Sequence, residues 1–147
     1  MKAEVFKGYK HPFIDDAFYV RDEVFTKEQG YPKEIDIDEY DNDAIHAVLY
    51  TENNQPIGTA RMIINEAGDA AKIGRVAIVK AERGKDYGLL VMQKLIDYAH
   101  ANNIFVITLH AQTHAQGFYE KLDFEVIGEG FMEDGAAHIR MDHRHEK

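Results

Sequence analysis

The sequence predicts a mixed α/β fold in one domain, residues 1–147, on three observations. Apolar residues recur at helical spacing after Leu89, and two apolar runs of strand length occur at Ile73–Val79 and Ile104–Ala111. The length is about that of one domain, and no repeat, low-complexity tract or linker divides the chain. We therefore expect helices packed on a mixed sheet.

The first 30 residues predict a strand followed by a helix. Glu4–Gly8 has the composition of a short strand. Asp15 or Asp16 can cap the helix, because an aspartate side chain accepts hydrogen bonds from the free N–H groups at a helix start. The helix should end before Gly30, and its buried positions should be Ala17, Val20, Val24 and Phe25.

Two apolar segments in the middle of the chain predict a hairpin. Ala44–Tyr50 and Ile57–Ile64 are strand-like, and Thr51–Pro56 between them is rich in turn formers. The almost wholly apolar run Ile73–Val79 that follows is typical of an interior strand covered on both faces.

The last third of the chain predicts two helices and three strands. A long helix begins near Leu89, with Leu89, Met92, Leu95, Ile96 and Ala99 as its apolar face. Ile104–Ala111 is an apolar strand, and a short helix at Thr113–Lys121 comes next. Phe124–Ile127 and His138–Met141 are the expected late strands.

Charge and composition exclude several classes of function. The net charge of −9 argues against general nucleic-acid binding, which depends on Lys and Arg at phosphates. The absence of cysteine excludes disulfides, thiolate metal sites and cysteine nucleophiles. We find no apolar run typical of a secretory signal or a membrane span, and therefore expect a soluble, cytoplasmic protein with no membrane partner.

Much of the acidity lies in one alternating stretch, which we interpret as a solvated loop. One charge elsewhere needs a partner: Arg75 interrupts an apolar strand, where an unpaired charge is costly. Glu39 or Asp41, from the acidic stretch, is the expected partner. The stretch consists of Glu34, Asp36, Asp38, Glu39, Asp41 and Asp43.

The segment Val76–Gly88 has the pattern of a strand, a glycine-containing loop and a helix start, which together suit an anion. A helix start offers free N–H groups, and Lys80–Gly88 contains three basic residues against two acidic ones. The segment is not a Walker loop, because Asp86 follows Lys85 where Ser or Thr is required, and it lacks the Rossmann glycine pattern. Taken alone, it is either a phosphate cradle or an ordinary strand-to-helix turn.

The loop resembles the signature of the GCN-related N-acetyltransferases, the GNAT family. That signature is Arg or Gln, two residues, Gly, one residue, then Gly or Ala. Arg83 and Gly88 match it, and Asp86 stands where the family usually has the middle glycine. Asp is among the residues that tolerate the left-handed backbone conformation best.

Two further blocks resemble the same family. Gln112, Ala115 and the run Phe118–Phe124 are similar to its late Asn, Ala and aromatic block, at a fitting distance from the loop. The amino-terminal half is similar to the ElaA-like or YjcF-like subgroup. The residues of that second similarity are Arg21, Val24, Phe25, Glu28, Gln29, Pro32 and the stretch from Asp36 to Asp41.

The resemblance implies the GNAT fold: a central, mostly antiparallel sheet that splays at the acyl-CoA site, with flanking helices. It implies acetyl-CoA as co-substrate, with the pantetheine arm added like a strand along the backbone of Val76 and Ile78. The diphosphate would bind the backbone N–H groups of Arg83–Gly88. The complete expected set is Val76, Ile78, Arg83, Gly84, Lys85, Asp86, Tyr87, Gly88, Leu89 and Gln112.

The resemblance also implies catalytic roles. A backbone N–H near Ile78 would hold the oxyanion of the tetrahedral intermediate, and Tyr119 aligns with the family's general acid. The alternative for Tyr119 is a packed aromatic residue. His110 is one candidate for the general base, and its alternative is a histidine hydrogen-bonded at a strand end.

Two histidine pairs are not predicted to form a metal site. His110 and His114 straddle the expected strand-to-helix turn, without carboxylates in a ligand pattern, so no metal is expected there. His143 and His145 alternate near the carboxyl end and are expected to be exposed.

The expected function is transfer of an acetyl group from acetyl-CoA to the primary amine of a small-molecule or peptide acceptor by direct attack. If the acidic stretch lines the acceptor pocket, cationic amines such as polyamines should react best. The alternative is an acyl-CoA-binding module with the same fold and no catalytic activity, and a general protein-interaction role is a third hypothesis. A homodimer is left open.

Overall fold

The computed structural model describes residues 1–144, with the side chains of residues 34 and 35 excepted. Its strands are β1 (Lys2–Lys7), β2 (Ile45–Tyr50), β3 (Pro56–Ile64), β4 (Ala70–Ile78), β5 (Val106–Gln112), β6 (Glu125–Glu133) and β7 (Ala136–Arg144). Its α-helices are α1 (Phe13–Arg21), α2 (Lys33–Asp36), α3 (Tyr87–Ala101) and α4 (Gln116–Glu120). A π-helix, Asp22–Glu28, continues α1, and short 3-10 turns occupy Glu39–Asn42, Lys80–Glu82 and Thr113–Ala115.

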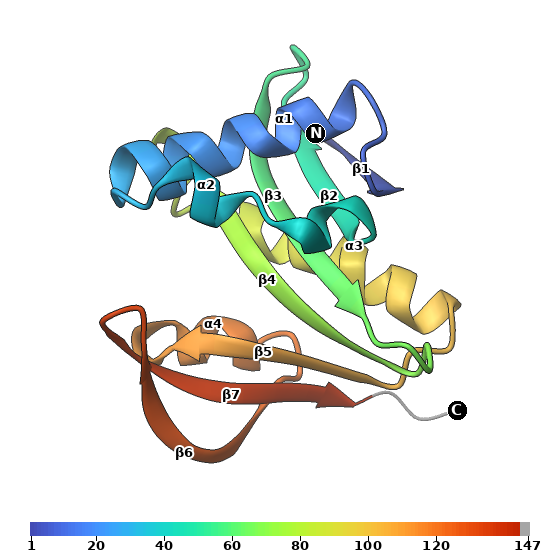
Figure 1. Cartoon of the computed structure of the whole chain (residues 1–147), viewed down its shortest axis with the longest axis vertical. Coiled ribbons are helices and arrows are strands. Elements are labelled where there is room, and N and C mark those ends of the chain that lie inside the picture. The colour runs from blue at the N-terminus through green and yellow to red at the C-terminus, as the bar shows by residue number, and fades with distance from the viewer. Residues whose placement is uncertain (145–147) are drawn as a thin grey trace.

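The seven strands form one sheet in the order β1-β2-β3-β4-β5-β7-β6. All strand pairs are antiparallel except β4 with β5. In Figure 1, α1 and α2 lie over one face of β2–β4 and α3 lies behind the other, while α4 lies behind β5. The mixed α/β fold and the mostly antiparallel sheet are therefore confirmed.

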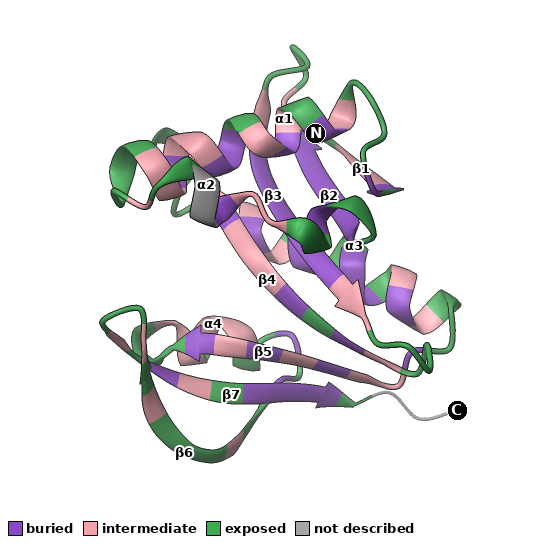
Figure 2. Cartoon of the chain, in the orientation of Figure 1, coloured by how far each residue is buried: buried purple, intermediate pink, exposed green. Residues whose placement is uncertain are grey.

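Strand β2 shows how the two helical layers share one core. Every residue of β2 is buried, as Figure 2 shows. Ile45, Ala47 and Leu49 pack in the cluster that contains α3, whereas Val48 and Tyr50 pack in the cluster that contains α1. This alternation follows from the two-residue period of a strand, and it explains why the segment is apolar at consecutive positions.

Strands β4 and β5 run side by side only at their beginnings. Three parallel pairs join them, from Ala70 with Val106 to Lys72 with Thr108. Beyond these pairs the two strands diverge, as Figure 1 shows. The segment predicted to be an interior strand, β4, is thus interior in sheet order. Most of its second half is nevertheless only partly buried, because β5 diverges from it there. The splayed sheet is confirmed.

A β-bulge in β4 accompanies the divergence. Arg61 of β3 pairs with Gly74, and Thr59 pairs with Ala77, so one residue of β3 faces two of β4. Arg75, at φ 52°, lies in this bulge. The extra residue places both Ile73 and Ile78 in the α3 cluster although five positions separate them.

Several predicted boundaries differ from the structure. Helix α1 begins at Phe13, so Asp15 and Asp16 lie in its first turn and do not cap it. Negative charge in a first turn still interacts favourably with the positive end of the helix. The late strands β6 and β7 are longer than expected, since they extend to a tight hairpin. No helix within residues 1–144 is both long and apolar enough to cross a membrane.

Candidate functional site

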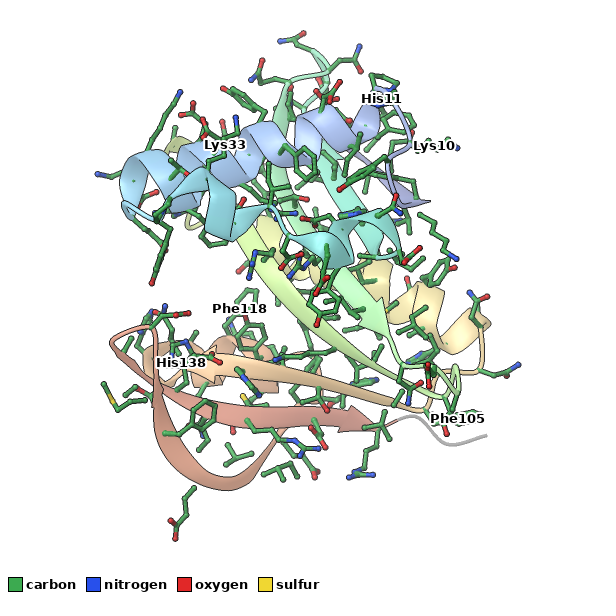
Figure 3. The ribbon with its side chains drawn as sticks, viewed as in Figure 1. Lys10, His11, Lys33, Phe105, Phe118 and His138 are labelled. Carbon is green, nitrogen blue, oxygen red and sulfur yellow. The ribbon has the colours of Figure 1, made fainter. Side chains whose placement is uncertain are left out.

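Two cavities lie where β4 and β5 diverge. The first, of about 410 Å³, is lined by residues of the π-helix, α2, β4, β5, α4 and β7 and of the segments between them. The second, of about 470 Å³, lies at the amino-terminal end of α3. Gln29, Val76 and His114 line both cavities, so the two are adjacent. In Figure 3, Phe118 and His138 mark the same side of the molecule, where the sheet opens.

The loop before α3 presents a run of free backbone donors. Within residues 1–144, no hydrogen-bond acceptor is found for the five consecutive N–H groups from Gly84 to Gly88. Gly84 at φ 82° and Asp86 at φ 61° both adopt the left-handed conformation. Left-handed residues in such loops bring successive N–H groups to one side, where they form an anion-binding concavity together with the positive end of a helix.

Not all of the loop residues predicted to bind the cofactor face the second cavity. Arg83, Gly84, Asp86, Tyr87 and Gly88 line the second cavity, with Val76 and Ile78. The N–H of Arg83 already donates to Lys80 O at 3.4 Å, so the free run begins one residue later than expected. Lys85 and Leu89 line neither cavity: Lys85 Nζ is 3.0 Å from Glu82 Oε2, and Leu89 packs against the core.

The open edge of β4 offers main-chain groups to a ligand. Val79 N–H donates to Ile57 O, on the β3 side, and strand geometry alternates the direction of successive residues. The main-chain groups of Val76 and Ile78 therefore point away from β3, to the edge of β4 from which β5 diverges. Ile78 O is already engaged, because Arg83 Nε donates to it at 2.9 Å.

Arg83 also connects the loop to the end of the π-helix. Its two terminal nitrogens donate to the two carboxylate oxygens of Glu28 at 2.6 and 2.7 Å. These hydrogen bonds lower the pKa of the Glu28 carboxyl and raise that of the Arg83 guanidinium. The pair joins the loop to the segment that contributes Val24 and Gln29 to the lining of the second cavity, a contact between residues that 55 positions separate.

Tyr119 and Gln112 both line the first cavity, on the α4 side of the opening. Burial raises the pKa of the Tyr119 hydroxyl to about 12. The tyrosine therefore stays protonated at neutral pH, as a proton donor must. Its ring lies edge-on to Phe118 and Phe124, at centroid distances of 4.9 and 6.1 Å. It is thus both packed and in contact with the cavity.

Gly88 is required by the close approach of α4. A Cβ atom at this position would lie 2.9 Å from Cζ of Phe118, which lines the second cavity. We expect Gly88→Ala to displace the Phe118 ring and to weaken acetyl-CoA binding roughly tenfold, with a loss of about 1 kcal/mol in the free energy of unfolding. Calorimetry and urea unfolding measure the two effects.

Gly117→Ala is the matched control, because no atom lies within 4 Å of the Cβ position there. It should leave binding unchanged, and it should not destabilise the protein, since Ala favours a helix more than Gly does. Equal affinity in the Gly88 and Gly117 variants would show that the contact with Phe118 does not shape the cavity.

His110 faces the first cavity and has a carboxylate partner that the sequence did not indicate. His110 Nδ1 lies 3.1 Å from Glu133 Oε1, and His138 Nε2 lies 3.8 Å from Glu133 Oε2. Both histidines line the cavity. The signal that could have located Glu133 is the Asp134-Gly135 pair, a strong hairpin turn, which places Glu133 at the end of one strand.

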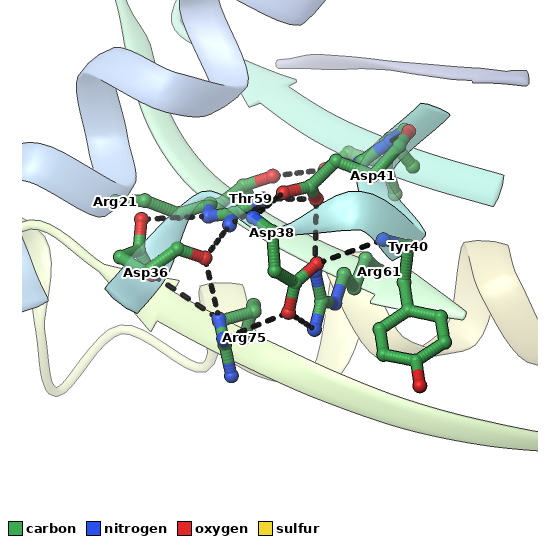
Figure 4. Close-up of polar contacts among 10 residues, drawn as sticks. Arg21, Asp36, Asp38, Tyr40, Asp41, Thr59, Arg61 and Arg75 are labelled. Atoms are coloured by element: carbon green, nitrogen blue, oxygen red, sulfur yellow. Dashed lines mark hydrogen bonds and ion pairs between the residues drawn. The ribbon is translucent and has the colours of Figure 1, made fainter. Parts of the chain in front are cut away.

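The acidic stretch is not a solvated loop. Asp36 and Asp41 are buried, and three buried or partly buried arginines bind the stretch, as Figure 4 shows. Arg21 makes a two-point contact with Asp41 at 2.6 and 3.1 Å, and its Nε donates to Asp36 at 3.1 Å. Arg61 binds Asp38 through two hydrogen bonds of 2.6 and 2.8 Å.

The prediction of solvation was wrong because three of these acidic residues neutralise three arginines. Glu39 and Asp43 are exposed, as expected, and the side chain of Glu34 lies outside the described residues. The expected partner of Arg75 was also wrong in detail: Arg75 Nε lies 3.2 Å from Asp36 Oδ1 and Nη2 lies 3.3 Å from Asp38 Oδ2. The need for a carboxylate partner was correct.

Asp41 is the residue on which this network converges. It accepts from Arg21, from Arg61 Nη1 at 3.0 Å and from the backbone N–H of Asp38 at 3.0 Å. Burial alone would raise the pKa of the Asp41 carboxyl, but these hydrogen bonds and charges outweigh it and lower the pKa to about 2. Asp41 is therefore ionised throughout the neutral range.

The carboxyl-terminal histidines also differ from expectation. His143 is buried, and its Nδ1 donates to Leu122 O at 2.9 Å. Its ring stacks on His100, with the two Nε2 atoms 3.0 Å apart. The prediction of exposure was therefore wrong for His143, since its strand is paired with β5, and His145 lies outside the described residues. Within residues 1–144, no three side chains are grouped to hold a metal ion.

Comparison with known proteins gives one consistent result. Residues 9–144 match the family described as acetyltransferase (GNAT) domain. An uncharacterised N-acetyltransferase of Bacillus subtilis, YjcF, is 35% identical over 142 residues, which cover 96% of this chain and 98% of that protein. The crystal structure of Escherichia coli ElaA is 28% identical, with a TM-score of 0.84, over 97% of this chain and 99% of that one.

A more distant structure shares the fold alone. It is the catalytic domain of the Tetrahymena GCN5 histone acetyltransferase in complex with coenzyme A, at 17% identity and a TM-score of 0.71. The match covers 97% of this chain and 92% of that domain.

Proposed function

Because the chain belongs to the GNAT acetyltransferase family, within its ElaA- and YjcF-like group, we propose that it transfers an acetyl group from acetyl-CoA to a primary amine by direct attack. Family membership supports acyl transfer from an acyl-CoA. We propose in addition that the acyl group is acetyl and that the acceptor is a primary amine. The observation that carries it is the combination of free N–H groups from Gly84 to Gly88 with the open edge of β4.

The two features match the two ends of coenzyme A. The diphosphate is doubly negative, and the five N–H groups at the start of α3 suit it without any charged side chain. The pantetheine arm carries two amides, which can hydrogen-bond to the open main chain of Val76 and Ile78 as an added strand would. Its thiol end would then lie between the second and the first cavity, which share Val76.

The chemistry would take place in the first cavity. The amine lone pair attacks the thioester carbonyl carbon, and a backbone N–H near Ile78, at the open edge of β4, would stabilise the resulting oxyanion. The C–S bond then breaks, and Tyr119 donates its hydroxyl proton to the leaving sulfur. His110 would receive the proton that the acceptor ammonium loses before attack.

The proposal is tested by following free thiol in mixtures of the protein, acetyl-CoA and a panel of primary amines. Release of CoA that depends on both protein and amine is expected. Calorimetry distinguishes the alternative hypothesis, an acyl-CoA-binding module without activity: binding of acetyl-CoA with no turnover for any amine would favour it. Failure to bind any CoA compound would contradict both and favour an interaction role.

Asp86→Gly should tighten acetyl-CoA binding about three- to tenfold. The substitution removes a negative charge beside the predicted diphosphate site, and glycine adopts φ 61° without the cost that an L side chain has there. The gain should shrink at high salt, because the charge is exposed. Calorimetric titration at two salt concentrations measures it.

Asp123→Gly is the control for this variant. Asp123 is also exposed, has φ 62° and lines neither cavity, so the substitution makes the same changes of charge and backbone freedom elsewhere. Weaker binding by the Asp86 variant would mean that this carboxylate supports the loop.

The geometry of the site indicates less about the identity of the acceptor than about that of the cofactor. Among the described side chains of the acidic stretch, Asp36 alone lines the first cavity, and Arg21 and Arg75 pair with it. The stretch therefore gives no support to a preference for polyamines over neutral-side-chain amines. A small-molecule or peptide acceptor, a homodimer and a cytoplasmic location remain predictions.

A further inference from the structure

A carboxylate and two histidines meet on one face of the sheet, at the wall of the first cavity. His110 lies on β5, His138 on β7 and Glu133 at the end of β6. The register explains why they share a face: His138 pairs with Gln112 on one side and with Phe131 on the other. His110 and Glu133 lie two residues from these partners, so their side chains point to the same face.

The contact between His110 and Glu133 determines which ring nitrogen is basic. An ionised carboxylate only accepts hydrogen bonds, so at 3.1 Å from Glu133 Oε1 the Nδ1 atom of His110 must carry the hydrogen. A neutral imidazole then has its lone pair on Nε2. His110 lines the cavity, and Nδ1 is engaged by Glu133, so the lone pair on Nε2 is the one available to an acceptor amine.

His138 leaves Glu133 available for this contact. Its Nδ1 lies 2.9 Å from the carbonyl oxygen of Ala136, which can only accept, so Nδ1 carries the hydrogen here as well. A neutral His138 then has only a lone pair on Nε2, at 3.8 Å from Glu133 Oε2. His138 therefore lies beside the Glu133 carboxylate without donating a hydrogen bond to it.

Glu133 is the last residue of β6 before a two-residue β-hairpin turn. Asp134 at φ 51° and Gly135 at φ 78° form a two-residue turn, and Glu133 pairs with Ala136 across it. The Phe131 ring lies edge-on to His110 at 5.0 Å and stacks on His138 at 6.2 Å. The carboxylate therefore approaches His110 from a fixed backbone position, between rings that pack on one another.

We propose that Glu133 is a positioning residue that holds His110 in the Nδ1–H tautomer, so that Nε2 serves as general base for the acceptor. The inference rests on the proposed acetyl transfer. In this step an N–H bond of the acceptor ammonium breaks and an Nε2–H bond forms, which makes the amine a nucleophile and His110 an imidazolium. The carboxylate of Glu133 stabilises that cation, which later releases its proton to water.

The remaining protons balance without another reactant. After attack, the nitrogen of the tetrahedral intermediate is positively charged and the oxygen negative. Collapse breaks the C–S bond, Tyr119 protonates the sulfur, and the tyrosinate recovers a proton from the nitrogen through solvent. The products are the amide, free CoA and the single proton that His110 has passed to water.

The test combines a spectroscopic and a kinetic measurement on the full chain. Long-range proton–nitrogen NMR of the imidazole rings should show the Nδ1–H tautomer for His110 in the protein alone. In Glu133→Gln, this tautomer should give way to Nε2–H, and kcat for acetylation should fall about tenfold with KM for acetyl-CoA unchanged. Glu133→Asp keeps the charge and should recover part of the loss.

Glu129→Gln is the matched control, because Glu129 is an exposed residue of the same strand and lines neither cavity. It should match the unmodified protein in both measurements. An Nε2–H tautomer for His110 in the unmodified protein, or a Glu133→Gln variant with unchanged tautomer and kcat, would overturn the proposal.

The two measurements also separate this inference from the proposed function. If no amine is acetylated, the proposed function fails. The tautomer, and its response to Glu133→Gln, would still decide whether Glu133 positions His110.

Discussion

Replacing Tyr119 by Phe is expected to lower kcat about 100-fold, which is the order of effect of a positioned general acid. Tyr119 lines the first cavity, and the pKa of its hydroxyl, raised to about 12 by burial, keeps the hydroxyl protonated over the whole neutral range. The leaving thiolate would then have to take its proton from water. Free-thiol release at saturating acetyl-CoA and amine measures the change.

The affinity for acetyl-CoA should survive this substitution, because Phe retains the ring that packs on Phe118 and Phe124. Tyr40→Phe provides the control: Tyr40 is exposed, lines neither cavity, and should behave as the unmodified protein. An unchanged kcat in the Tyr119 variant would establish the alternative in which this side chain is only a packed aromatic.

Asp41→Asn is expected to reduce the free energy of unfolding by about 3–5 kcal/mol, the usual cost of removing one partner from a buried ion pair. Arg21 is 1% exposed and Asp41 is fully buried, so water cannot replace the lost charge. Urea unfolding followed by circular dichroism measures the loss. Asp43→Asn removes an exposed carboxylate two residues away and should change stability by less than about 0.5 kcal/mol.

The same carboxylate gives stability a defined dependence on pH. The folded pKa of Asp41, about 2, lies below the ordinary value of about 3.9. Its contribution is thus complete above about pH 4 and is lost as the pH falls through 2; the expected size is roughly 2 kcal/mol. Asp41→Asn should lack this part of the acid-induced loss. Parallel pH profiles for the variant and the unmodified protein would contradict the assignment.

The elements that sequence reasoning located correctly are those whose signal is local. The apolar face of α3 repeats at helical spacing, and the turn formers between β2 and β3 join neighbouring strands. The order of strand, glycine-containing loop and helix from Val76 into α3 is likewise read from neighbouring residues. In each case the residues that carry the signal lie within about one helix or hairpin of one another, so the pattern and the structure coincide.

The acidic stretch, which was predicted to be a solvated loop, shows the limit of local sequence patterns. An alternation of acidic residues looks the same whether water or arginine neutralises it, and here the arginines are distant in sequence. Arg21 precedes Asp36 by 15 positions, and Arg75 follows it by 39. Which of these groups would meet depends on the packing of α1 on the sheet and on the bulge in β4.

The sequence alone determined the mixed α/β order of elements, the loop Val76–Gly88 and the resemblance that predicts acyl-CoA binding there. Only the tertiary structure showed that five consecutive N–H groups of this loop have no acceptor among the described residues and that Arg83 binds Glu28. Only the sheet order β5-β7-β6 brought Glu133 to His110 across an intervening strand. The reason is physical: a local pattern specifies an element, whereas contacts between elements depend on strand register and helix packing that no short segment encodes.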